Sequence, residues 1–197
     1  MDIPKLSKAT ELVTSEWINT DAPLSIGALR GKVVVIYAFQ MLCPACVSHG
    51  LPQIKKVQQF CSEADVQVIG IHTVFEHHDV MTADALKTFA YEYRLTFPIA
   101  IDQASNVGPI PETMLAYRLQ GTPSLVIIDK EGFVRFQHLG IVDDLPLGSL
   151  IGHLVAEQSD ETAIANESPS PTQNETTLKD ENLREVICND EQCEIKR

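Results

Sequence analysis

The sequence lacks any long apolar run and has no excess of positive charge. No stretch approaches the roughly 18 consecutive apolar residues of a membrane-spanning helix, and residues 1–8 contain no apolar core of a secretory signal. The formal net charge is -12, and no basic stripe is present to neutralise phosphate groups. We therefore expect a cytoplasmic protein that binds neither nucleic acid nor membranes.

Cysteine is scarce too, and its arrangement is informative. The chain has 5 cysteines in 197 residues, an odd number that does not suggest a framework of structural disulfides in a reducing compartment. Cysteines that are close in sequence then indicate catalysis or metal binding. Two such pairs are present, Cys43 with Cys46 and Cys188 with Cys193.

The composition changes near residue 159 and divides the chain into two parts. Residues 1–158 are sufficient for one domain with a complete hydrophobic core. Residues 159–197 contain ten acidic and four basic side chains, a net charge of -6, and few apolar ones. Because such a segment buries too little apolar surface to offset its chain entropy, we predict an acidic, mostly disordered tail that carries a cysteine pair.

Short β-branched runs alternate with helical patterns in the first part. The last two runs are separated by Asp129-Lys130-Glu131-Gly132, where glycine suits a hairpin turn. This order predicts an α/β fold with a central mixed β-sheet that is covered by helices on both faces. We expect strands at residues 32–39, 66–71, 97–101, 125–128 and 133–137, and helices at residues 47–61, 83–93 and 146–158.

The motif Cys43-Pro44-Ala45-Cys46 lies where a predicted buried strand ends and a predicted helix begins. Free amide groups and the helix dipole stabilise an anion at such a place, so we expect a lowered pKa for Cys43. Cys43 is then an exposed nucleophile, and Cys46, one turn further and deeper, is the resolving thiol. Pro44 fits the first helical turn, which does not need its missing N–H. The arrangement predicts thiol-disulfide exchange; the alternative is a structural zinc site shared with the second cysteine pair.

A proline directly before a predicted strand is a second feature. In Gly121-Thr122-Pro123-Ser124 the proline precedes residues 125–128, at a place where strands tolerate proline only as a first residue or in a special turn. A cis Thr122–Pro123 bond would account for it. The alternative is a trans proline that simply starts the strand.

From about residue 17 to about residue 155 the chain resembles the thioredoxin superfamily, in particular its redoxin branch with the alkyl hydroperoxide reductase/thiol-specific antioxidant and TlpA-like proteins. The resemblance implies a thioredoxin-like fold. We predict a thiol-disulfide oxidoreductase without a bound cofactor or metal, which acts on a protein or small-molecule disulfide and needs a reducing partner. The resemblance also implies that Pro44, Thr122 and Pro123 contact the substrate, because the family's proline loop faces the cysteines. The resemblance rests on Gly31-Lys32-Val33-Val34-Val35, Cys43-Pro44-Ala45-Cys46, Gly121-Thr122-Pro123-Ser124 and Ile128-Asp129-Lys130-Glu131-Gly132.

Three positions depart from the family pattern. Leu42 stands where thioredoxin has tryptophan, and Tyr37 stands where it has a buried acid, so the proton of Cys46 must move through another group or water. Gln40 stands where peroxiredoxins have a threonine or serine that binds peroxide, although glutamine can also donate a hydrogen bond. A peroxiredoxin-like thiol peroxidase, in which Cys43 forms a sulfenic acid, is the second hypothesis.

Several histidines accompany the cysteines. Loops after the strands of an open α/β sheet line its functional crevice, so His72 and His78, together with His49 on the first predicted helix, are candidates for proton transfer. The alternative is that these side chains belong to a solvated loop. A third functional hypothesis is a carrier that binds copper or zinc through Cys43, Cys46 and His72 or His78 without turnover.

The tail cysteines, Cys188 and Cys193, are distant in sequence from the domain. A flexible linker can return them to its surface at high effective concentration. We therefore consider them a secondary redox pair, a tethered dithiol that exchanges with Cys43 and Cys46; the alternative is two exposed thiols without a role. Cys61 ends a predicted amphipathic helix and is expected to be a small core residue.

Overall fold

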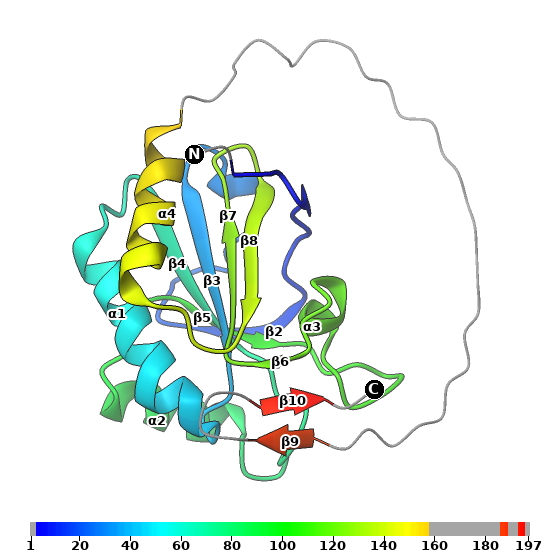
Figure 1. The fold of residues 1–197 in the computed structure, drawn as a ribbon. Helices are drawn as coiled ribbons and strands as arrows, with labels where there is room; N and C mark the ends of the chain where they lie inside the picture. Colours follow the sequence, from blue (N-terminus) through cyan, green and yellow to red (C-terminus); the bar gives the residue numbers. More distant parts are fainter. Residues whose placement is uncertain (1–2, 158–185, 189–192, 196–197) are drawn as a thin grey trace, which may run out of the picture.

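The computed structural model describes residues 3–157, 186–188 and 193–195. A seven-stranded sheet forms the centre of the domain. Its strands are β1 (Ser7–Lys8), β2 (Thr14–Ile18), β3 (Val33–Phe39), β4 (Val66–His72), β5 (Ile99–Asp102), β7 (Ser124–Ile128) and β8 (Phe133–Leu139). They follow the order β1-β8-β7-β3-β4-β5-β2 (Figure 1). Because β3, β4 and β5 are parallel and the other neighbours are antiparallel, the predicted mixed sheet is confirmed.

The central strand β3 is buried along its whole length. It pairs with β4 in parallel and with β7 in antiparallel orientation, and elements cover both faces of the sheet. A strand in this position has no solvent-facing side, which explains why its sequence is a continuous run of β-branched and aromatic residues. Its carboxyl end leads directly into the cysteine motif, so the core determines where the motif begins.

Helices flank this sheet. The helices α1 (Leu51–Phe60) and α4 (Asp144–Ala156) lie side by side over one face (Figure 1), where Lys56 Nζ lies 2.7 Å from Asp144 Oδ2. The helix α2 (Ala83–Glu92) stacks Phe89 on Phe39 of β3, with 6.5 Å between ring centroids. The short α3 (Glu112–Ala116) lies on the other side of the sheet, and a 3-10 turn (Gly27–Leu29) precedes β3. Across the described ranges, none of the helices has the length and apolar character needed to cross a membrane.

The first predicted helix, residues 47–61, differs from the observed one. Helical backbone begins at Pro44, and a π-helix (Cys46–Gly50) precedes α1. Pro52, in the first turn of α1, has no N–H to donate to the carbonyl of Ser48, so the regular ladder of hydrogen bonds is interrupted there. Isolated π turns of this kind are rare and often mark functional sites.

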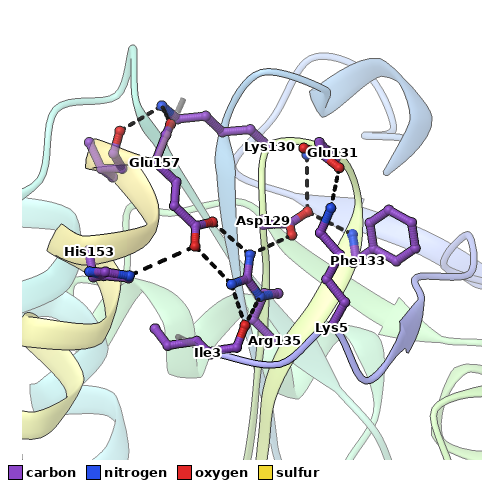
Figure 2. Close-up of polar contacts among 10 residues, drawn as sticks. Ile3, Lys5, Asp129, Lys130, Glu131, Phe133, Arg135, His153 and Glu157 are labelled. Atoms are coloured by element: carbon purple, nitrogen blue, oxygen red, sulfur yellow. Dashed lines mark hydrogen bonds and ion pairs between the residues drawn. The ribbon is translucent and has the colours of Figure 1, made fainter. Parts of the chain in front are cut away.

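A buried ion cluster lies beside the β7–β8 hairpin turn (Figure 2). Because Ile128 at this end of β7 pairs with Val34 at the amino end of β3, the cluster lies at the end of the sheet away from the cysteine motif. Arg135 on β8 donates to Asp129 at 2.9 Å and to both carboxylate oxygens of Glu157 at 2.6 and 2.8 Å. Its Nε donates to the carbonyl oxygen of Ile3 at 3.0 Å. The cluster thereby joins the N-terminal segment, the β7–β8 hairpin and the end of α4. Gly132 in the hairpin turn has φ +84°, as its predicted place requires.

Candidate active site

Cys43 occupies the N-cap position of the helix that follows β3. Its carbonyl oxygen accepts the first helical hydrogen bond from Val47 N at 3.1 Å, and its Sγ accepts the N–H of Cys46 at 3.4 Å. The sulfur therefore stands where a serine or aspartate oxygen caps other helices. Free amide groups and the helix dipole both favour a negative charge at this point.

The two motif sulfurs ionise very differently. The hydrogen bond from the Cys46 side chain is the main cause that lowers the pKa of Cys43 to about 6; burial opposes it, and backbone N–H groups and Thr122 assist it. Burial raises the pKa of Cys46 well above its ordinary value. At neutral pH, Cys43 is therefore a thiolate and Cys46 keeps its proton. This difference suits Cys43 for attack and Cys46 for resolution.

The expectation that Cys43 is an exposed nucleophile is wrong. Its exposed fraction is 1%, and that of Cys46 is 0%. The proline loop packs on the motif, because Cys43 Sγ lies 3.6 Å from the carbonyl oxygen of Thr122. The Thr122–Pro123 peptide bond is cis, which decides between the two alternatives that the sequence left open. The resemblance places the proline loop opposite the cysteines, but how completely Cys43 is covered depends on tertiary packing, which explains the error.

Tyr37 is a part of the site that the sequence identified only as a departure from the family. Its hydroxyl donates to the carbonyl oxygen of Cys46 at 3.2 Å. A Cβ at Gly50 would lie 1.8 Å from that hydroxyl oxygen, so the π-helix must present a glycine to the ring. Burial, followed by the nearby Cys46 and Cys43, raises the pKa of Tyr37 well above its usual value. Tyr37 therefore stays protonated and positions the backbone of Cys46.

His72 supports the loop before the motif. It is 1% exposed, and burial lowers its pKa to about 4. Its Nε2 accepts the N–H of Met41 at 3.4 Å, and its ring lies 5.4 Å from that of Phe39. A neutral imidazole with this hydrogen bond holds the chain in place and is a poor proton donor at pH 7.

The other two candidate histidines are exposed. His49 contacts Ser48 Oγ at 2.7 Å and lines a pocket of about 370 Å³ that also includes Tyr37 and Pro123. His49 therefore shares this pocket with Pro123 of the proline loop, and its role in proton transfer stays a prediction. His78 lies in the exposed loop after β4, where no contact with the motif is seen among the described residues.

Gln40 is already engaged on both sides of its amide. It is fully buried, donates to Glu76 Oε1 at 3.1 Å and accepts the N–H of Phe75 at 3.2 Å. The Gln40 amide is therefore hydrogen-bonded to the loop after β4 and is not directed at an incoming peroxide. The geometry therefore gives no specific support to the peroxidase hypothesis.

Two of the hypotheses from the sequence require a metal ion bound by cysteines. Within the part of the chain that the structure describes, no three His, Cys, Asp or Glu side chains are grouped to hold a metal ion, so Cys43 and Cys46 are not joined by a histidine as the carrier hypothesis requires. The zinc alternative requires the side chains of Cys188 and Cys193, which are outside the part of the structure that is described. Cys61 is half-buried, and burial raises its pKa.

The thiolate of Cys43 is expected to titrate near pH 6. Because its pKa is lowered, the anion is present above this pH and disappears as the pH falls through it. Burial raises the pKa of Cys46 and Cys61, so these two thiols ionise only in alkaline solution. The measurement is the ultraviolet thiolate absorbance of the reduced protein, with Cys43→Ser as the control that lacks the transition. A first transition above pH 8 would contradict this assignment.

The mixed sheet, the cysteine pair at a helix start and the cis-proline loop against the first sulfur define a thioredoxin-like dithiol protein. The chain belongs to the Redoxin family, whose model matches residues 6–146. The predicted superfamily, its redoxin branch and the thioredoxin-like fold are thereby confirmed.

Two solved structures are strongly similar to this chain. A thioredoxin-like superfamily protein is 50% identical with a TM-score of 0.76, over 78% of this chain and 99% of that one. A thiol-disulfide isomerase from Corynebacterium glutamicum is also 50% identical with a TM-score of 0.73, over 80% and 99% of the two chains. The name of the second protein agrees with the predicted enzyme class.

Curated relatives include a much larger protein. NHL repeat-containing protein 2 of Homo sapiens is 30% identical over 128 residues, which are 64% of this chain. The match spans only 16% of that relative's length. The similarity therefore concerns one part of a longer protein.

Proposed function

We propose that this chain is a thiol-disulfide oxidoreductase that works through Cys43 and Cys46. The Cys43 thiolate attacks one sulfur of a substrate disulfide, the substrate S–S bond breaks, and the other substrate sulfur leaves as a thiolate and takes up a proton. Cys46 then loses its proton and attacks Cys43, so a Cys43–Cys46 disulfide forms and the substrate leaves reduced. A reducing partner returns the pair to two thiols.

The observation that carries this proposal is the opposite ionisation of two sulfurs held one helical turn apart. A thiolate is the nucleophile in exchange, and a low pKa gives Cys43 this form at neutral pH. The raised pKa of Cys46 keeps it from competing until the mixed disulfide has formed. The second step then needs only the loss of one proton.

The surroundings of the motif suit a protein substrate. Leu42, which precedes the nucleophile, is 56% exposed, and Pro44, which follows it, is also exposed, so apolar surface flanks Cys43 on both sides in the chain. The proline loop packs against the same cysteine, where Thr122 contacts the sulfur. We assign Pro44, Thr122 and Pro123 to substrate binding on this basis.

Stopped-flow measurements with two oxidants test the proposal. The reduced protein is mixed with a model disulfide and, separately, with hydrogen peroxide, and loss of the Cys43 thiolate is followed. We expect rapid exchange with the disulfide and slow reaction with peroxide, because Gln40 is engaged with Glu76 and Phe75. Fast peroxide consumption with slow disulfide exchange would establish the peroxidase instead.

A further inference from the structure

A second, smaller sheet joins the C-terminal segment to the proline loop. It consists of β6 (Gly121–Thr122), β10 (Cys193–Ile195) and β9 (Val186–Cys188), in the order β6-β10-β9. Both pairs are antiparallel. Figure 1 shows the two red strands next to β6, below the main sheet. The predicted tail thus returns to the domain at the loop that packs on Cys43.

The register places the tail cysteines at informative positions. Cys193 lies opposite Thr122, and Cys188 lies opposite Cys193. The carbonyl oxygen of Thr122 is in turn 3.6 Å from Cys43 Sγ. Thr122 of the proline loop therefore neighbours both Cys193 and the nucleophile Cys43.

The same register is compatible with a disulfide between the two tail cysteines. Residues directly opposite in an antiparallel pair have Cα atoms about 4.5 or 5.5 Å apart. Disulfides form from Cα separations of about 4.4–6.8 Å. A Cys188–Cys193 bond therefore requires no rearrangement of the paired backbone.

Strand addition is a general way to bind an extended peptide, because main-chain hydrogen bonds supply affinity without a specific sequence. Here β10 pairs with β6, whose Thr122 carbonyl oxygen lies 3.6 Å from Cys43 Sγ. With this arrangement Cys43 is only 1% exposed. An external disulfide that approaches along β6 must displace the tail strand first.

We propose that Cys188 and Cys193 form an intramolecular substrate of the motif, docked on the proline loop by strand addition. This inference rests on the proposed function. The Cys43 thiolate attacks the Cys193 sulfur of a tail disulfide, and Cys188 leaves as a thiolate. Cys46 then loses its proton and attacks Cys43, which releases Cys193 as a thiolate. Two electrons pass from the motif to the tail pair, and the second step ends with a Cys43–Cys46 disulfide.

The tail would then have two functions. Once reduced, its dithiol can leave the proline loop and carry the electrons to a disulfide that does not fit the site. While docked, the tail shields the Cys43 thiolate from other oxidants. The reverse sequence, from a motif disulfide to a tail dithiol, uses the same atoms and the same contacts.

Trapping the mixed disulfide in the full chain tests the proposal. In Cys46→Ser the second step is blocked, so after oxidation of the tail pair we expect a Cys43–Cys193 bond, identified by peptide mass spectrometry without reduction. The fraction trapped should stay constant over about a hundredfold dilution, because a tethered thiol has an effective concentration on the order of millimolar. Cys46→Ala serves in parallel, since alanine adds no polar group at a fully buried position.

Two further variants of the Cys46→Ser protein are matched controls. With Cys193→Ser added the trapped species should be lost, and with Cys61→Ser added it should remain. Absence of the Cys43–Cys193 bond, its formation only between chains at high concentration, or a bond to Cys188 in its place would overturn the proposal. If Cys46→Ser still captures a model disulfide, only the tail inference fails; if it captures neither, the proposed function fails as well.

Discussion

Cys43→Ser is expected to reduce disulfide exchange to the uncatalysed background, whereas Cys46→Ser should keep the first attack and stop turnover. The reason is that Cys43 supplies the thiolate and Cys46 acts only on the mixed disulfide. Single-turnover kinetics with a model disulfide, followed by mass spectrometry of the quenched protein, separates the two steps. The mixed disulfide should accumulate in Cys46→Ser and never form in Cys43→Ser.

A third variant, Cys46→Ala, has a pH signature. The hydrogen bond from the Cys46 side chain is the largest cause of the low pKa of Cys43. Cys46→Ala removes this donor and should raise that pKa, whereas the serine hydroxyl of Cys46→Ser can still donate to the sulfur. At pH 7 the first attack in Cys46→Ala should then be slower than in the unmodified protein and should recover as the pH rises. Cys61→Ser is the control and should leave both steps unchanged. Exchange that survives in Cys43→Ser, or a Cys46→Ser protein without any first attack, would contradict the assigned roles.

Arg135→Ala is expected to destabilise the fold by about 3–5 kcal/mol, since removal of one partner leaves a buried charge uncompensated. The side chains of Arg135 and Asp129 are each 4% exposed, and the arginine also holds Glu157 and the backbone of Ile3 (Figure 2). Urea unfolding measures the effect as a lower midpoint with an unchanged m value.

A matched control comes from an exposed ion pair. Lys56 and Asp144 are each 57% exposed, so Lys56→Ala should cost less than about 1 kcal/mol. If Arg135→Ala costs no more than Lys56→Ala, the cluster does not hold the N-terminal segment and α4 to the hairpin as we describe. The cluster lies away from the motif, so a folded Arg135→Ala protein should retain the Cys43 transition near pH 6.

The central elements were predictable because the local pattern of apolar residues reflects how deeply these elements are buried. The strand β3 is covered on both faces, and only continuous β-branched and aromatic residues satisfy that environment. The hairpin turn was equally clear, since Gly132 supplies the positive φ. In contrast, β1 and β2 were missed because they are short and largely polar, and their pairing with β8 and β5 comes from distant parts of the chain.

The functional site also combines features that the local sequence predicts with features that depend on distant contacts. The spacing of Cys43 and Cys46 at a strand–helix junction indicated the chemistry, because one helical turn and the helix terminus are local properties. The roles of His72 and Gln40 could not be inferred, since their hydrogen bonds to Met41 and Glu76 depend on how loops fold over the sheet. Burial changed His72 from a candidate acid into a neutral support.

The sequence by itself determined the mixed sheet and the order of the two cysteines, because hydrophobic periodicity and helix-end electrostatics act between near neighbours in the chain. Its short motifs also carried the resemblance to the redoxin family. Only the tertiary structure decided that Cys43 is covered, that Tyr37 meets Gly50, and that Cys193 pairs with Thr122. Each of these contacts brings together segments far apart in the chain, and their register depends on the packing of the whole domain.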